Sequence, residues 1–227
     1  MGRLTEVDHE QRRARVQPHE GAPRELHYDH LVVGLGAESR VFPIPGLADQ
    51  AVGFQSLPEA TYLRDHVLER LESADATTDE AARRRALTFV FVGGGYTGVE
   101  ALGELDDMAR AARQRIPRLR GEHLRWVLVE ATDRILPTVA PGLREVAAHE
   151  LRRRGVEIFL ETQLESAEGG RLALSDGRVL EADTLVWSAG MRPPPGGRAG
   201  PADRRPRPSR GRRLLAGGRR RGSLGGR

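Results

Sequence analysis

The sequence contains no cysteine, no lysine and no asparagine among its 227 residues. Without cysteine the chain can form no disulfide, no thiolate metal site and no redox-active cysteine pair. All 36 strongly basic residues are therefore arginine. So much arginine, beside abundant alanine and glycine, is typical of a GC-rich coding sequence and does not by itself indicate guanidinium chemistry.

Long apolar runs are lacking as well. No stretch approaches the roughly 20 residues that cross a bilayer, and the N-terminus has no signal-peptide core. We expect a cytoplasmic protein that is either soluble or peripheral to the inner face of the plasma membrane. The seven histidines are scattered without the spacing of metal ligands, so no metal site is expected.

Charge is distributed unevenly along the chain. Residues 191–227 contain 12 Arg, 9 Gly and 6 Pro, with Asp203 as their single acid, for a formal charge of +11. The preceding residues hold 24 basic and 31 acidic side chains, a formal charge of −7. Because the segment 191–227 lacks aromatics and apolar periodicity, we expect it to be disordered and do not expect nucleic-acid binding.

The most informative stretch places a glycine-rich turn between an apolar strand and a helix. The strand is Leu87–Val92, a β-branched and aromatic run typical of a buried parallel strand. Apolar residues then recur at helical spacing from Val99 to about Gln114. Three glycines with G-x-G-x-x-G spacing lie between, Gly93, Gly95 and Gly98, and this order predicts dinucleotide binding. The alternative is a glycine-rich turn in an α/β protein without a ligand.

At such a turn, the start of the helix can hold a diphosphate on free N–H groups and on the positive end of the helix dipole. Gly94, Tyr96 and Thr97 supply the remaining backbone of the predicted cradle. Tyr96 could also place its ring over a ribose, although simple packing is the favoured explanation of an aromatic residue here.

An acidic residue ends the next predicted strand. Glu130 follows Leu124–Val129 and is placed to accept hydrogen bonds from both hydroxyls of an adenosine ribose. It lies 32 positions after Gly98, where the simple unit expects about 20, and a long helix with an inserted loop explains the excess. Arg134 could pair with a 2′-phosphate, but Glu130 would repel that group, so NAD(H) is favoured over NADP(H).

The rest of the chain predicts an α/β fold with a parallel sheet. An N-terminal hairpin is expected from Leu4–Val7 and Ala14–Val16, and Tyr28–Ala37 reads as a buried strand entering a glycine turn. Asp75–Arg85 reads as charged, solvated surface. The other expected elements are a strand at 52–57, a helix at 58–73, a helix at 143–154, a strand at 156–160, a hairpin at 171–180 and a final buried strand at 183–190.

These segments together resemble the type II NADH dehydrogenases, flavoproteins of the pyridine nucleotide-disulfide oxidoreductase superfamily. The most specific match is Val90–Glu100. The resemblance is carried by the segments Tyr28–Gly36, Ile44–Gly46, Thr88–Glu104, Val127–Pro137 and Asp183–Pro193. In that family an FAD domain is interrupted by an NADH domain, and NADH reduces the flavin, which reduces a quinone.

The resemblance implies a domain organisation and further site residues. It predicts a partial FAD-binding domain at 1–57, a connecting helix and linker at 58–81, a Rossmann-like NAD(H)-binding domain at 82–190 and a disordered tail at 191–227. Glu100 would approach the nicotinamide as the catalytic residue, or alternatively complement the helix dipole. Gly190 would line the cofactor site at the end of the last strand.

Two functions remain open at this point. The resemblance implies an FAD-dependent NADH:acceptor oxidoreductase whose acceptor is a quinone. The alternative is a truncated, non-catalytic NAD(H)-binding fragment, because the family's own glycine loop for FAD is not found before Leu31. On this alternative we expect the chain to bind NADH without oxidising it.

Overall fold

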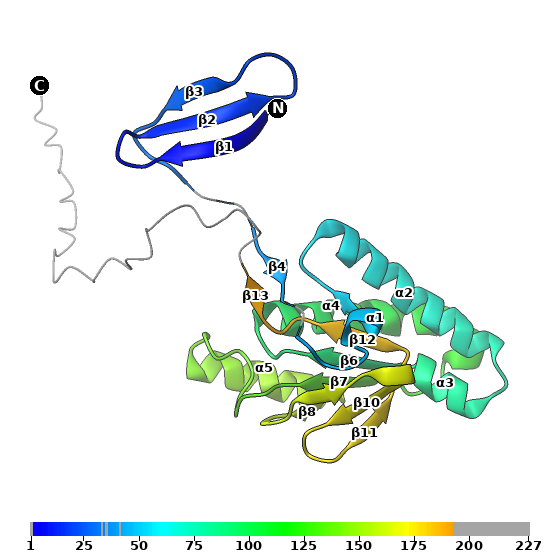
Figure 1. Ribbon diagram of the computed structural model, residues 1–227. Helices are drawn as coiled ribbons and strands as arrows, with labels where there is room; N and C mark the ends of the chain where they lie inside the picture. Colours follow the sequence, from blue (N-terminus) through cyan, green and yellow to red (C-terminus); the bar gives the residue numbers. More distant parts are fainter. Residues whose placement is uncertain (1, 33, 35, 41, 193–227) are drawn as a thin grey trace, which may run out of the picture. The chain divides into compact units, whose positions relative to one another are not determined.

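The computed structural model describes residues 2–32, 34, 36–40 and 42–192 (Figure 1). They fall into two compact units, one within residues 2–32 and one within residues 34–192. The Arg/Gly/Pro segment from residue 193 onward, predicted to be disordered, lies outside the described residues.

The first unit is a three-stranded antiparallel sheet in the order β1-β2-β3. The predicted hairpin is confirmed by β1 (Gly2–Asp8) and β2 (Arg13–Pro18), whereas β3 (Arg24–His27) was not expected. Among the apolar residues of this unit only Ala14 is buried. Such a sheet buries little apolar surface, so hydrophobic burial contributes little to its stability.

The prediction of a buried strand at Tyr28–Ala37 is wrong. The described residues of this stretch form no strand, and Val32 is 90% exposed. A fully apolar strand is stable only between neighbouring strands, and no described strand pairs with it. The chain next forms β4 (Glu38–Ser39), which pairs with β13 (Met191–Arg192), so regular structure continues two residues into the segment that was predicted to be disordered.

The second unit is built on a five-stranded parallel sheet in the order β5-β12-β6-β7-β8. Its central strands are continuously apolar because both faces of the sheet are covered. The predicted strands are confirmed, although those predicted at 52–57 and 183–190 end at Gly53 and Trp187. The strands are β5 (Ala51–Gly53), β6 (Thr88–Val92), β7 (Arg125–Val129), β8 (Glu157–Phe159) and β12 (Thr184–Trp187).

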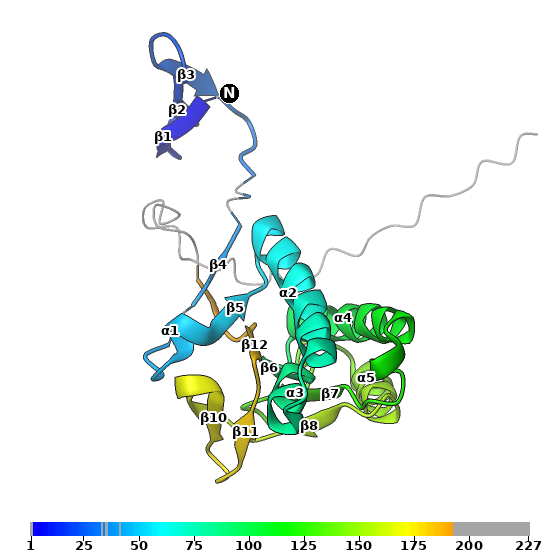
Figure 2. The same cartoon turned by 90° about the vertical axis from the view of Figure 1, so that its right-hand side faces the viewer.

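Helices cover one face of this sheet (Figure 2). Phe89, Phe91 and Trp126 point into this layer and pack with apolar residues of the helices. The connecting 3-10 turn η1 (Pro117–Leu119) buries Leu119 in the same layer. The helices are α2 (Leu57–Ala76), α3 (Glu80–Ala86), α4 (Tyr96–Arg115) and α5 (Pro141–Arg153).

A small antiparallel sheet covers the opposite face, in the order β11-β10-β9. The predicted hairpin is confirmed by β10 (Arg171–Leu174) and β11 (Val179–Glu181), while β9 (Leu164–Ser166) was not expected. The short helix α1 (Leu47–Gln50) and the 3-10 turn η2 (Glu168–Gly170) complete this layer. The unit is therefore a sandwich of helices, parallel sheet and antiparallel sheet.

One helix was not expected, and the predicted helices differ from the observed ones at their ends. The Asp75–Arg85 stretch contains α3, which begins because the Asp79 carboxylate accepts hydrogen bonds from the Ala81 and Ala82 N–H groups. Helix α4 begins at Tyr96, three residues before the predicted Val99, because apolar periodicity marks the buried face of a helix and not its first turn.

The contact between α2 and β12 carries a pH-sensitive group. Nε2 of His66 lies 3.0 Å from the Thr184 hydroxyl, and burial together with Arg70 lowers the pKa of His66 from its ordinary value of 6.5. The unfolded chain then binds more protons than the folded chain between the two pKa values. The stability from neutral His66 is thus present above pH 6.5 and is lost as pH falls through the folded-state pKa.

We therefore expect the unfolding free energy of the wild type to fall more than that of His66→Gln when the pH is lowered through this window. Urea unfolding of both proteins on either side of the His66 pKa measures the difference. An equal pH dependence of the two proteins would show that His66 is not the titrating group.

Candidate functional site

The three glycines of the predicted fingerprint have three different environments. Gly93 has φ +115°, a left-handed conformation that favours glycine. A Cβ at Gly98 would lie 2.2 Å from the Gly93 carbonyl oxygen, so the third glycine permits the close contact of helix and strand. At Gly95 no atom lies within 4 Å of a Cβ position, which leaves open space beside the turn for a ligand.

The N-terminus of α4 presents free amides beside this space. Gly95 is the N-cap, and the Val99 N–H donates to its carbonyl at 3.1 Å. The amides of Tyr96 and Thr97 precede the first intrahelical hydrogen bond and have no acceptor in the helix. Tyr96 is 65% exposed, so its ring is not a core residue. Open space and free amide donors thus lie together at this turn, and their binding of a diphosphate stays a prediction.

Glu130 lies at the carboxyl end of β7, next to the glycine-rich turn. Its Oε2 accepts a hydrogen bond from the Gly94 N–H at 2.6 Å. Its Oε1 accepts from the amide and the hydroxyl of Thr132, both at 2.8 Å. The structure therefore brings together the two parts of the prediction, the turn and the acid, which are far apart in the sequence. Thr132 was not identified from the sequence, since a lone threonine after a strand carries no distinctive pattern.

Ser188, which follows β12, is a second residue that sequence analysis missed. Its hydroxyl lies 3.1 Å from the Val92 carbonyl and 3.0 Å from the Gly93 carbonyl. The Gly93 N–H donates to the Val129 carbonyl at 2.9 Å. The backbone of Gly93 is thus hydrogen-bonded on one side to β7, through Val129, and on the other to the residue that follows β12, Ser188. The Ser-Ala-Gly end of the last strand could have suggested a small residue here, but not which backbone group it contacts.

A cleft of about 240 Å³ opens at this carboxyl edge of the sheet. Gly93, Glu130 and Ala189 contribute from the ends of three parallel strands, and Phe42 and Trp187 form part of its apolar wall. The Phe42 and Trp187 rings meet edge to face with centroids 5.6 Å apart. In open α/β sheets ligands bind at this edge, where the strand order reverses.

Gly190 lies in the turn after β12. It has φ +73°, and its carbonyl accepts a hydrogen bond from the Arg40 N–H at 3.1 Å. A Cβ there would come within 3.1 Å of the Phe42 ring, so the turn and the ring are in close contact. The strand predicted to run to Gly190 ends at Trp187, and the part of Gly190 in cofactor binding stays a prediction.

Glu100 lies in the second turn of α4, because the helix begins at Tyr96. Its side chain is exposed. The helix dipole acts mainly within the first turn, so this position weakens the alternative in which Glu100 only complements the dipole. Residues four apart share a helix face, and Glu100 therefore lies on the same side of α4 as Tyr96.

Arg134 forms an ion pair with Asp133, its neighbour in the sequence. Its Nε donates to Oδ1 of Asp133 at 2.6 Å, and its Nη2 contacts Oδ2. This guanidinium holds the pKa of Asp133 below its usual range. The only arginine that the sequence suggested as a partner for a 2′-phosphate is thus already paired with a carboxylate.

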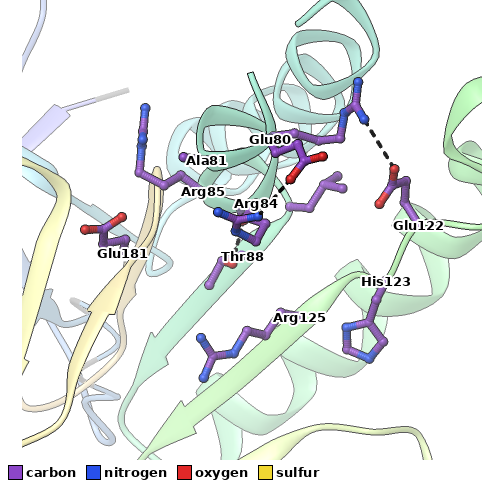
Figure 3. A pocket seen from close by; sticks show the side chains of 11 residues that line it. Glu80, Ala81, Arg84, Arg85, Thr88, Glu122, His123, Arg125 and Glu181 are labelled. Atoms are coloured by element: carbon purple, nitrogen blue, oxygen red, sulfur yellow. Dashed lines mark hydrogen bonds and ion pairs between the residues drawn. The ribbon is translucent and has the colours of Figure 1, made fainter. Parts of the chain in front are cut away.

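A larger cleft, about 540 Å³, lies at the opposite edge of the sheet, at the first residues of β6 and β7 (Figure 3). Its four arginines each have a carboxylate within 4 Å. The pairs are Arg83–Glu122, Arg84–Glu80, Arg85–Asp183 and Arg125–Glu157. This cleft has no unpaired arginine for an anionic ligand and lies away from the carboxyl edge, so the candidate site is the smaller cleft.

Within the ranges that the structure describes, no helix is long and apolar enough to cross a membrane. The same residues contain no group of three or more histidine, aspartate or glutamate side chains that could hold a metal ion.

Comparison with known proteins places the chain among nucleotide-dependent reductases. The family model described as pyridine nucleotide-disulphide oxidoreductase matches residues 1–203. A type II NADH:quinone oxidoreductase of Mycobacterium tuberculosis, NdhA, is 33% identical over 176 residues, which are 75% of this chain and 37% of that protein. A probable NADH dehydrogenase of Dictyostelium discoideum is 32% identical over 177 residues, 76% of this chain and 39% of the relative.

A solved structure shares the fold. NDH2 from Plasmodium falciparum in complex with NADH superposes with a TM-score of 0.67 at 19% identity, over 84% of this chain and 40% of that one. The chain thus spans about two fifths of the length of these relatives. The predicted α/β fold and the resemblance to type II NADH dehydrogenases are confirmed.

Proposed function

Because the chain belongs to the pyridine nucleotide-disulphide oxidoreductase family, we propose that its parallel-sheet unit is the NAD(H)-binding domain of an FAD-dependent NADH:quinone oxidoreductase. One observation carries the proposal. The glycine-rich turn, the free amides of α4 and the Glu130 carboxylate meet at the carboxyl edge of the sheet, where Gly94 and Glu130 are joined by a 2.6 Å hydrogen bond.

Each part of the cofactor has a partner among the described residues. The amides of Gly95, Tyr96 and Thr97 would hold the diphosphate, and Glu130 would accept from the adenosine ribose. Gly190, which follows the neighbouring strand β12 by three residues, would bring its backbone beside the nicotinamide. Glu100, one turn along α4 from Tyr96, would orient the carboxamide.

The whole enzyme would oxidise NADH and reduce a quinone, and FAD, held by residues other than those described, would supply the redox chemistry between them. The nicotinamide supplies the hydride, so the residues of this unit bind and orient it and need not act as acid or base. The expectations of a cytoplasmic location or of attachment to the inner face of the plasma membrane, and of domain limits at residues 57, 81 and 190, remain part of this proposal.

NADH titration tests the proposal. We expect saturable binding of NADH by the purified chain without added FAD, followed by nicotinamide fluorescence, because the whole cradle lies in one compact unit. NADPH should bind more weakly, since Glu130 repels its 2′-phosphate and Arg134 is paired with Asp133. Absence of saturation at about 1 mM, where binding is worth only about 4 kcal/mol, would contradict the proposal.

A specific observation favours a second candidate, NAD(H) binding without turnover. The stretches 2–32, 34, 36–40 and 42–192 contain no second glycine-rich turn at a helix start, and one such turn serves one diphosphate. These residues therefore do not fit FAD as a second dinucleotide, and no step through flavin is assigned to them. NADH consumption with a soluble quinone, with and without FAD, separates the candidates: a rate above about 1 per second lies in the ordinary enzyme range and favours the first.

A further inference from the structure

We propose that Glu130 is also a positioning residue, which holds the glycine-rich turn in its binding conformation before any dinucleotide arrives. This inference rests on the proposed NAD(H) site and adds a role to the acid that was predicted to bind ribose. It concerns the peptide groups of Gly94, the middle glycine of the turn.

Both polar backbone groups of Gly94 are held by the loop that follows β7. Its N–H donates to Oε2 of Glu130 at 2.6 Å, and its carbonyl accepts from the Leu136 N–H at 2.7 Å. A Cβ at Gly94 would lie 3.0 Å from Oε2 of Glu130 and 3.0 Å from Cγ2 of Ile135. The turn and the loop are thus in direct contact, and Gly94 is the residue that permits the contact.

The Glu130 carboxylate is itself fixed in this position. Its other oxygen, Oε1, accepts from the amide and the hydroxyl of Thr132 at 2.8 Å each. Hydrogen bonds to a carboxylate are roughly twice as strong as neutral ones. A carboxylate has about four acceptor positions, so capacity for a ribose hydroxyl remains.

This arrangement determines which amides can bind a diphosphate. The Gly94 N–H is already used, so the donors left for the ligand are those of Gly95, Tyr96 and Thr97. Because the turn is held in shape in the free protein, less conformational freedom is lost when the ligand binds. Glu130 therefore contributes to diphosphate binding through Gly94 as well as to ribose binding by direct contact.

Amide hydrogen exchange in the free, full-length chain tests the arrangement independently of NADH binding. We expect the Gly94 amide to exchange slowly and the Gly95, Tyr96 and Thr97 amides to exchange fast. On addition of NADH, new protection should appear at these three amides and not at Gly94. A Gly94 amide that exchanges fast and becomes protected only with NADH would be a ligand donor and would overturn the proposal.

Substitution of Glu130 tests the contribution to affinity. The ligand is an NADH analogue whose adenosine ribose lacks its 2′ and 3′ hydroxyls, so direct ribose contacts cannot contribute. Glu130→Ala should weaken this analogue about tenfold and speed Gly94 exchange by a similar factor, as expected for loss of one charge-assisted hydrogen bond. Glu130→Gln keeps a side-chain carbonyl for the Gly94 N–H. It should therefore retain most of the affinity for the analogue and most of the protection of the Gly94 amide.

Glu165→Ala, an exposed carboxylate on β9, is the charge-matched control and should change neither quantity. Unchanged affinity of Glu130→Ala for the analogue would limit Glu130 to the ribose and overturn the proposal, while NADH binding itself could still hold. If Glu130→Ala does not fold, Glu130→Gln and the wild-type exchange pattern decide: fast Gly94 exchange in either protein counts against the proposal.

Discussion

Gly98→Ala is expected to abolish high-affinity NADH binding and to destabilise the fold by about 1–3 kcal/mol, the usual cost of overpacking. The new Cβ would lie 2.2 Å from the Gly93 carbonyl oxygen and 2.4 Å from the Ser188 hydroxyl oxygen. Neither atom can move freely, because Gly93 is hydrogen-bonded to Val129 and Ser188 is hydrogen-bonded to Val92. Helix α4 must then shift away from β6, and the amides at its start move with it.

Gly103→Ala in the same helix is the matched control. No atom lies within 4 Å of a Cβ at Gly103. Alanine is a better helix former than glycine by about 0.8–1 kcal/mol. We therefore expect Gly103→Ala to raise the unfolding free energy and to leave the NADH dissociation constant unchanged. Thermal unfolding and NADH titration of both variants measure the contrast, and similar behaviour of the two would contradict the role assigned to Gly98.

The glycine-rich turn and Glu130 could be predicted from the sequence because each is marked by residues that lie close to it in the chain. The apolar strand before Gly93, the helical periodicity after Gly98 and the acid after the next strand each depend on neighbours in the chain. Their mutual placement follows from the parallel sheet, since consecutive strand ends meet at one edge. The 32-residue spacing to Glu130 is explained by the 20-residue helix α4 and the turn η1.

What sequence analysis missed depends on contacts between distant segments. Ser188 acts on the carbonyl of Gly93, which is 95 positions away. The helix α3 has three arginines in its last turn and a single buried residue, Ala86, so no apolar stripe marks it and only the Asp79 cap does. The apolar run at Tyr28–Ala37 predicts a strand only when neighbouring strands cover it, and a run by itself cannot supply them.

The side chains on the helix-facing side of the sheet also help to position the site, because Glu130 directly follows the last residue of β7. Trp126 of this strand is 1% exposed. Its ring stacks on Phe89 of β6 with centroids 4.4 Å apart, and it lies 6.0 Å from the Phe91 ring. This aromatic cluster joins the two strands that end in the glycine-rich turn and in the acid.

Trp126→Ala should lower the unfolding free energy by about 3–5 kcal/mol, the range for removing a large buried aromatic side chain. Whole domains are stable by only about 5–15 kcal/mol, so this variant should be largely unfolded on mild warming and should lose NADH binding with the fold. Urea unfolding followed by circular dichroism measures the change.

Trp126→Phe removes the indole N–H but only part of the side-chain volume that Trp126→Ala removes. In the described part of the chain, the buried Nε1 of Trp126 has no hydrogen-bond partner. An unsatisfied buried donor costs about 1–3 kcal/mol, and phenylalanine removes that cost while it keeps a ring against Phe89. The gain offsets the smaller ring, so we expect Trp126→Phe to lie within about 1.5 kcal/mol of the wild type. A loss as large as that of Trp126→Ala would contradict this expectation and would mean that the full volume of the indole, and not ring stacking alone, stabilises the contact between β6 and β7.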